Sequence, residues 1–248
     1  MPERNFDLYV KDFNILPFER VQEKFRKRRL LELLNKHLGI DSKAILEVGP
    51  GLNSIFLEGL TNHTGVTLEP TMELFEKLEL SLGDMSNILI LNQTLEEFAL
   101  KSQNKFDVVV FSSVLHEIQD VNKNLELVVK LLKPEGLFFV VVPNNQSVHR
   151  ILGVHLGLLE SVDSLTETEI LMKQYRNFSP DSLRKLLEKY FHIIEILTSF
   201  VKPLSHRQME NQINTQEDSN ENLENLYSVS KFFEPFGSEI FAICGVLQ

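Results

Sequence analysis

The sequence predicts an α/β fold in which a sheet is covered by helices on both faces. Helix-type and strand-type segments alternate between residues 16 and 143, as a sheet covered on both faces requires. The run FDVVVF at 106–111 is almost entirely apolar, which is typical of a strand buried on both faces, and we expect it at the centre of the sheet. A strand-type run at 44–48 stops at the glycine turn 49–51. With 248 residues, one domain over 1–248 is the expected organisation.

The elements follow one another in a regular order up to residue 143. Helices are predicted at 16–38, 54–60, 72–82, 125–132, 182–190 and about 222–233, and strands at 44–48, 65–68, 88–91, 106–111, 137–142, 193–200 and 239–246. Residues 133–136 (KPEG) predict a turn. The stretch 144–178 is irregular, which favours a functional segment. Residues 206–225 are rich in Asn, Gln and Glu, and we expect a mobile loop there.

Composition and charge narrow the function classes. Apolar residues make up 43% and charged residues 24%, and the 25 Lys and Arg against 35 Asp and Glu give a net charge of −10. This charge disfavours nucleic acid and anionic membrane surfaces as partners. The single cysteine, Cys244, and the absence of a CxxC motif predict no intrachain disulfide and no metal site. The charged N-terminal residues and short apolar runs predict a cytoplasmic, soluble protein. We interpret the basic run 24–29 as a solvated helix face.

The strand, glycine turn and helix start at 45–54 (ILEVGPGLNS) form the most informative motif. Glycines let the backbone approach a ligand, and a helix start offers free N–H groups. Glu69 ends the next strand about 20 residues after the first glycine, where a carboxylate accepts hydrogen bonds from ribose hydroxyls. The two features together predict an adenosine-type ligand, with an ordinary strand-helix turn as the alternative. Ser54 stands where an NAD fingerprint needs a third glycine, and Glu47 suits an ammonium group better than a pyrophosphate.

These residues resemble the first motif, E/D-x-G-x-G, of class I S-adenosylmethionine-dependent methyltransferases. FDVVVFSSVLHEI at 106–118 is similar to the family's fourth motif, and LLKPEGLFFVVVP at 131–143 to its fifth strand. The resemblance implies a Rossmann-like seven-stranded sheet with the last strand antiparallel, a cofactor-binding core at 41–143 behind an N-terminal helical segment at 1–40, and S-adenosyl-L-methionine as cofactor. The cofactor-binding residues that it implies are Glu47, Gly49, Pro50, Gly51, Asn53, Glu69, Gln93, Thr94 and Ser112.

Methylation of a hydroxyl group benefits from a catalytic base, whereas an acceptor that is already anionic needs only alignment. Three side chains are candidates for such a base. His116 and Glu117 follow the fourth strand, and His149 lies in the irregular segment. A packing or capping role is the alternative for each. Ser112-Ser113-Val114-Leu115 replaces the N/D/S-P-P-Y/F/W sequence of many nucleobase methyltransferases, which argues against a nucleobase acceptor.

The second half of the chain is similar to methyltransferases of bacterial surface (capsular or O-antigen) polysaccharide biosynthesis. The resemblance rests on stretches such as PNN at 143–145, VHR at 148–150 and FVKPLS at 200–205. It implies O-methylation of a small polar acceptor, a sugar or a phosphorylated or phosphoramidate-type precursor, with acceptor-side insertions at 144–178 and 206–235. The implied acceptor-binding residues are Asn144, Asn145, Arg150, Tyr175, Arg176 and Lys202, besides His149.

Two other functions stay open on the sequence. One is methylation of another small metabolite, such as a carboxylic acid. The other is a cofactor-binding protein without turnover. For the two asparagines a turn-shaping role, and for Arg176 a surface ion pair, are the structural alternatives.

Overall fold

A seven-stranded mixed sheet forms the centre of the protein. The structure is a computed structural model that describes residues 17–166, 169–170, 174–215 and 219–247. The strands are β1 (Ala44–Val48), β2 (Thr64–Leu68), β3 (Ile88–Leu91), β4 (Phe106–Ser112), β5 (Leu132–Pro143), β6 (Phe191–Ser199) and β7 (Glu239–Val246). Their order across the sheet is β3-β2-β1-β4-β5-β7-β6, with β7 antiparallel to both its neighbours. The predicted fold class, with the last strand antiparallel, is confirmed, and β4 is central.

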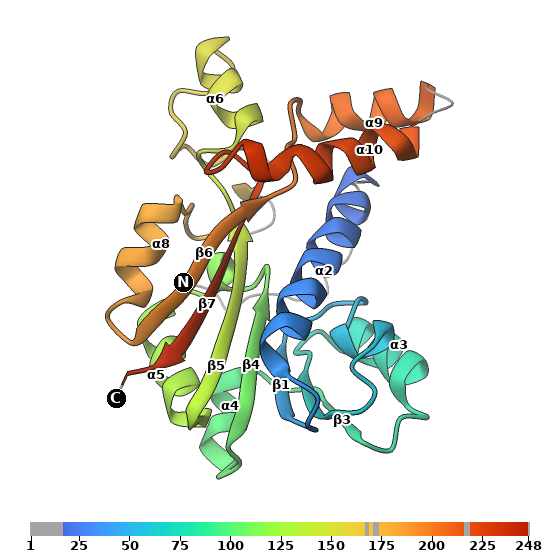
Figure 1. Cartoon of the computed structure of the whole chain (residues 1–248), viewed down its shortest axis with the longest axis vertical. Coiled ribbons are helices and arrows are strands. Elements are labelled where there is room, and N and C mark those ends of the chain that lie inside the picture. The colour runs from blue at the N-terminus through green and yellow to red at the C-terminus, as the bar shows by residue number, and fades with distance from the viewer. Residues whose placement is uncertain (1–16, 167–168, 171–173, 216–218, 248) are drawn as a thin grey trace.

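Helices cover both faces of this sheet (Figure 1). One face packs against α4 (Leu95–Lys101), α5 (Val121–Leu131) and α8 (Pro180–Leu187), and the other against α2 (Pro17–Leu38), η1 (Ile55–Glu58) and α3 (Met72–Leu82). The side chains of β4 alternate between the two cores, with Val109 and Phe111 in the first and Val108 and Val110 in the second. This double burial is the physical reason for its continuous apolar sequence.

A third layer lies beyond the carboxyl ends of the parallel strands. It consists of α6 (Val148–His155), α9 (His206–Thr215), α10 (Ser219–Ser228) and η3 (Val229–Phe232), at the top of Figure 1. Phe200, at φ 60°, turns the chain out of β6 into this layer. Its ring packs between Phe18 and Phe25 of α2, at centroid distances of 6.3 and 5.0 Å, and these rings form a cluster with Met209, Leu223 and Tyr227. The cluster fixes α9 and α10 against the N-terminal half of α2.

Several sequence predictions need correction. The prediction of a mobile loop at 206–225 was wrong, because its described residues lie mostly in the helices α9 and α10. Met209 of α9 and Leu223 and Tyr227 of α10 are buried in the cluster around Phe200, and this contact holds the two polar helices in place. The turn predicted at 133–136 lies inside β5 as an irregularity, since the pairing with β4 shifts between Phe106 and Val108. The helix predicted at 54–60 is the short 3-10 helix η1.

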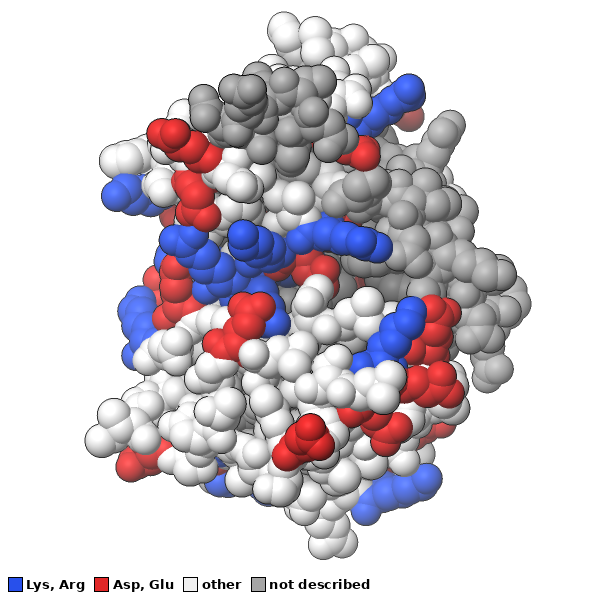
Figure 2. Space-filling model, turned by 90° about the vertical axis from the view of Figure 1, so that its right-hand side faces the viewer, with Lys and Arg blue, Asp and Glu red and all other residues white. Residues whose placement is uncertain are grey.

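The basic run 24–29 is a solvated face only in part. Arg26 and Lys27 are buried, and Lys27 forms an ion pair with Glu58 at 3.2 Å. Arg28 and Arg29 pair with the carboxylate of Glu32 on the same helix. On the face shown in Figure 2, Lys and Arg side chains gather in a band across the middle, with acidic side chains among them.

Candidate functional site

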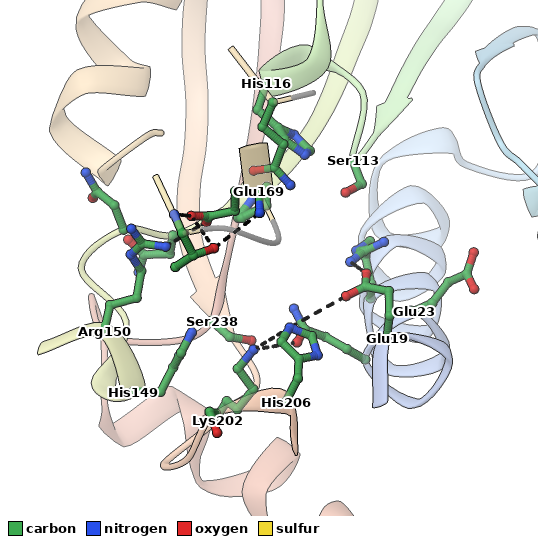
Figure 3. Close-up of a pocket in the computed structure, with 18 of the residues that line it drawn as sticks. Glu19, Glu23, Ser113, His116, His149, Arg150, Glu169, Lys202, His206 and Ser238 are labelled. Carbon is green, nitrogen blue, oxygen red and sulfur yellow. Dashed lines mark hydrogen bonds and ion pairs between the residues drawn. The ribbon is translucent and has the colours of Figure 1, made fainter. Parts of the chain in front are cut away.

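A cavity of about 970 Å³ lies at the carboxyl ends of the parallel strands. Its walls come from the N-terminal half of α2, the glycine turn after β1, the residues after β4 and β5, α6, and residues 202–208. Figure 3 shows that His116 and Ser113 lie on one side of this space and Lys202, His206 and Ser238 on the other. The volume lies at the upper end of the range for small-molecule sites, which leaves room for two ligands side by side.

The glycine turn adopts a backbone conformation that few other residues tolerate. Gly49 and Gly51 have φ values of 62° and 61°, and the Gly49 N–H donates to the carbonyl of Leu68 on β2 at 2.8 Å. A Cβ on Gly51 would have open space around it, whereas one on Gly49 would lie 2.9 Å from Cγ2 of Val114. Both glycines line the cavity, as do the predicted cofactor residues Pro50, Asn53 and Ser112.

Glu69 lies beside this turn, although it does not line the cavity. Its Oε2 accepts from the Gly51 N–H at 3.0 Å, and its Oε1 accepts from the Thr71 N–H at 2.9 Å. Each carboxylate oxygen can accept more than one hydrogen bond, and these two bonds orient the group beside the turn. The contact ties the second-strand acid directly to the glycine turn.

Glu47 has a different environment from the one the sequence predicts. Its side chain is buried, where it accepts from Ser54 Oγ at 2.5 Å and from the Ile55 N–H at 2.8 Å. Burial raises the pKa of this carboxyl to about 7 against the opposing effect of those two hydrogen bonds. It lines a small space of about 30 Å³, which shares Pro50, Asn53 and Ser112 with the large cavity. In this structure Glu47 therefore holds the start of η1.

Two further predicted cofactor residues, Gln93 and Thr94, also lie off the cavity wall. Thr94 is the N-cap of α4: its hydroxyl accepts from the Glu97 N–H, and the Glu97 carboxylate accepts from the Thr94 N–H. This reciprocal capping box gives Thr94 a structural role.

The residues after β4 present the first candidate base. Ser113 has a φ of 64°, unusual for a residue with a side chain, and it lines the cavity together with His116 and Glu117. His116 is buried, with its Nε2 3.8 Å from Glu117 Oε1. The sequence contains no pattern that could have marked Ser113 as strained.

Tyr175 and Arg176 were predicted to bind the acceptor, but neither lines the cavity. The Arg176 guanidinium donates to the carbonyls of Leu115, Ile118 and Gln119, at 3.4, 2.7 and 2.9 Å. The Tyr175 N–H donates to the His116 carbonyl at 3.0 Å. Both residues therefore bind the backbone of the turn that carries His116.

The two asparagines after β5 differ in whether their side-chain amides still have a group available to bind a ligand. Asn144 Nδ2 donates to the carbonyls of Pro235 and Gly237, and its Oδ1 accepts from the Gln146 N–H, so the side chain shapes this loop. Asn145 Nδ2 donates to Asp163 at 2.5 Å, and its buried Oδ1 has no partner among the described residues. Asn145 is thus the better placed of the two for a ligand that donates a hydrogen bond.

His149 and Arg150 also reach the cavity. His149 Nδ1 lies 3.0 Å from Ser147 Oγ, and burial, followed by the charge of Lys202, holds the pKa of its imidazole well below the usual range. A neutral imidazole is the form in which histidine acts as a base. The Arg150 guanidinium, by contrast, binds the Glu169 carboxylate at 2.6 Å and the carbonyls of Val162 and Ser164. Its main role is to anchor the segment after α6.

Lys202 belongs to a buried polar cluster that the sequence did not reveal. Its Nζ lies 3.2 Å from Gln22 Oε1 and 2.9 Å from His206 Nε2. Arg26 binds the carboxylates of Glu19 at 2.7 Å and Glu239 at 2.5 Å. Glu19, Gln22 and Arg26 follow one another at helical spacing, so a search for polar residues on one face of the predicted helix could have found three of its members.

Burial dominates the titration of this cluster. It lowers the pKa of Lys202 to about 8 and that of His206 to about 4, where the charge of Lys202 adds to the effect. Burial also raises the pKa of the Glu239 carboxyl against the pull of Arg26. In Glu19, burial acts to raise the pKa, but Arg26, His206 and Lys202 together lower it. His206 is therefore neutral at pH 7, and its Nε2 accepts from the Lys202 ammonium.

Two other properties bear on function. Among the residues that the structure describes, no three His, Cys, Asp or Glu side chains form a group that could hold a metal ion. No described helix is long and apolar enough to cross a bilayer.

Comparisons with known proteins agree with the geometry. A family model described as a methyltransferase domain matches residues 20–190. No curated protein matches the sequence significantly.

Several solved structures share the fold. The 1,6-didemethyltoxoflavin-N1-methyltransferase of Burkholderia thailandensis, with its acceptor and S-adenosylhomocysteine bound, has a TM-score of 0.61 at 13% identity, covering all of this chain and 93% of the other. The N-methyltransferase NodS of Bradyrhizobium japonicum, with S-adenosylhomocysteine, has a TM-score of 0.55 at 13% identity over 94% and 89%. A possible histamine N-methyltransferase of Thermotoga maritima has a TM-score of 0.58 at 17% identity over 96% and 97%. At these identities the likeness concerns the fold. Two of these structures contain S-adenosylhomocysteine, and the third is described as a methyltransferase that depends on S-adenosylmethionine.

Proposed function

The chain belongs to the methyltransferase domain family, with S-adenosylmethionine as cofactor, and we propose that it methylates an oxygen atom of a small acceptor molecule. One observation carries the proposal: the same cavity is lined by the glycine turn on one side and by His149, Asn145 and Lys202 on the other. A cofactor and an acceptor bound there would share one enclosed space. Placing two reactants in contact supplies much of the rate enhancement in such a transfer.

The residues present fit the cofactor. The open space beside Gly51 is where a ligand can approach the backbone, and the Glu69 carboxylate beside it suits ribose hydroxyls. We therefore assign Gly49, Pro50, Gly51, Asn53 and Ser112 to its amino-acid portion and Glu69 to its ribose. When bound, the sulfonium supplies a methyl group, which an acceptor oxygen takes with a lone pair while the S–C bond electrons return to sulfur.

The protein's own task is to orient the acceptor and to take its proton. His116 and His149 are the two imidazoles of the cavity that the sequence nominates as bases, and Glu117 is the carboxylate beside His116. The burial of His149 keeps its imidazole neutral, which supports it as the proton acceptor. Arg176 and Tyr175 support His116 indirectly through the turn that they bind.

For the acceptor, we propose a sugar or a phosphorylated precursor of surface polysaccharide, handled in the cytoplasm. The support is the resemblance in the second half of the chain and the polar side chains of Asn145, His149 and Lys202 in the cavity. The segments 144–178 and 206–235 would then be acceptor-side additions to the core at 41–143. A carboxylic acid metabolite is the second candidate, which the buried ammonium of Lys202 favours.

Two measurements test the proposal. Calorimetry should show that S-adenosylmethionine and S-adenosylhomocysteine bind while NAD does not. Incubation with methyl-labelled cofactor should then label a member of a panel of nucleotide sugars, sugar phosphates and carboxylic acids. Binding of NAD alone would contradict the proposal at the cofactor. Tight cofactor binding without transfer to any panel member or cell-extract fraction would favour a protein without turnover.

A further inference from the structure

Lys202 is a buried cation whose hydrogen-bonding capacity is not filled. Its side chain is 2% exposed, and its two hydrogen-bond partners, Gln22 and His206, are both neutral. An ammonium group has three N–H donors, so one is left. Among the described residues, no carboxylate oxygen lies within ion-pair distance of Nζ. Burial of such a group is costly unless something else binds it.

Ser238 adds a second unfilled donor on the same side of the cavity. Its side chain is 2% exposed, and its Oγ has no hydrogen-bond partner among the residues described. In Figure 3 Ser238 lies beside Lys202, and both face the space across from His116. Two adjacent donors without acceptors suit an oxygen atom of a ligand.

The acids around Lys202 do not occupy this position. Glu19, Glu239 and Glu169 all act on Lys202 through space, but the first two are bound by Arg26 and the third by Arg150. The attraction of Lys202 therefore remains available to a ligand.

The adjoining wall of the cavity is apolar. Leu152 and Leu156 lie one helical turn apart at α6, and Leu158 follows them, with side chains 41%, 67% and 74% exposed. Leu159 and Leu204 extend this lining. A ligand made only of hydroxyl groups would leave this surface wet, whereas an apolar body would cover it.

We propose that the acceptor is an amphipathic anion: a carboxylate or phosphate bound by Lys202 and Ser238, carried on an apolar chain or ring that covers Leu152, Leu156 and Leu158. This proposal specifies the class of acceptor for the methyl transfer proposed above, and it rests on that proposed function. Because Lys202 lies across the cavity from His116 and Ser113, it anchors the acceptor and leaves the reacting oxygen to the other end.

The test uses binding to the full-length protein saturated with S-adenosylhomocysteine, so that no acceptor need be known. The fluorescent anion 8-anilinonaphthalene-1-sulfonate should bind at one site and be displaced by n-alkanoates. From butanoate to decanoate, the affinity should rise about fourfold per methylene, which corresponds to ~0.8 kcal/mol per buried CH₂. Octanoate and octyl phosphate should both compete better than octanol, and octylamine should compete least.

Variants locate the site. Lys202→Met should abolish the preference for octanoate over octanol. Ser238→Ala should weaken the same preference, and it provides the test if Lys202→Met does not fold. Leu156→Asp should weaken octanoate at least tenfold. Leu80→Asp is the matched control, because Leu80 is 89% exposed on α3 and does not line the cavity. Its affinities should equal those of the unmodified protein.

The possible failures are distinguishable. Octylamine binding as tightly as octanoate would overturn the anion site, and equal affinities for butanoate and decanoate would overturn the apolar wall. A dimer in sedimentation that Leu156→Asp dissociates would show that a second copy covers the leucines, which also contradicts the proposal. Calorimetry of S-adenosylhomocysteine runs beside each titration, and loss of that binding in the unmodified protein would contradict the proposed function instead.

Discussion

Arg26 of α2 donates a hydrogen bond to Glu239, the first residue of β7, over 2.5 Å, although 213 residues separate them in the chain. Both side chains are buried, and Arg26 also binds Glu19. The pair fixes the N-terminal half of α2 over the cavity.

Removal of one partner should therefore destabilise the protein strongly. Arg26→Met leaves the Glu239 carboxylate buried without its cation, and we expect a loss of about 3–5 kcal/mol in the free energy of unfolding. The double variant Arg26→Met/Glu239→Met should lose less, because only Glu19 is then left without its cation. Urea denaturation measures both. The exposed pair Lys77–Glu73 is the control, and Lys77→Met should change little. Equal losses of unfolding free energy in the single and double variants would show that the unpaired Glu239 carboxylate is not the cause of the destabilisation.

The two glycines of the turn should differ in their tolerance of a side chain. Gly51→Ala introduces only backbone strain, on the order of 1–2 kcal/mol. Gly49→Ala adds the 2.9 Å approach to Val114 and should cost more, in both unfolding free energy and affinity for S-adenosylhomocysteine. The double variant Gly49→Ala/Val114→Ala should recover part of the difference. Identical behaviour of the two single variants in calorimetry would contradict this account of the turn.

The buried carboxyl of Glu47 predicts a pH dependence of stability. Its pKa is raised by burial to about 7 in the folded protein, against about 4.3 in an unfolded chain. Between these values the folded state binds more protons, so this group's stabilising contribution is complete below the unfolded pKa and is lost as the pH rises through 7. The change is on the order of 3–4 kcal/mol.

Glu47→Gln should flatten this part of the profile. Urea denaturation at several pH values between about 5 and 8 measures the slope for both proteins. The difference between the two curves isolates Glu47 from the other groups that titrate in this range. Parallel curves would mean that Glu47 has an ordinary pKa.

His116→Ala and His149→Ala test the assignment of the base. Substitution of the histidine that acts as the base should lower the turnover rate about 10²–10⁴-fold, with little change in affinity for S-adenosylhomocysteine. His155→Ala is the matched control on α6, since His155 is exposed and does not line the cavity. The rate is measured with the acceptor that the labelling panel identifies. Unchanged turnover in both variants would remove histidine from the base role.

The sequence predicted the scaffold more completely than the acceptor side. The strands at 88–91 and 239–246 were predicted to the residue, because apolar periodicity and turn residues are local signals. The glycine turn and Glu69 were also placed together correctly, because adjacent parallel strands end at the same edge of a sheet. Residues 206–225 were missed as helices because helix formation there depends on contacts with Phe18, Phe25 and Phe200, which the local composition does not show.

The sequence by itself determined the seven strands in their order along the chain, the glycine turn and the family, since each depends on residues close together in the chain. Only the tertiary structure decided which polar side chains meet. Gln22 forms hydrogen bonds with both Lys202 and Glu239, which lie 180 and 217 residues away in the chain. The side chains of Asn144, Arg150 and Arg176 instead bind backbone carbonyls or, for Arg150, also the acid Glu169. A side chain's type states what it can bind, but packing of distant segments sets whether those bonds are made within the protein or left for a ligand.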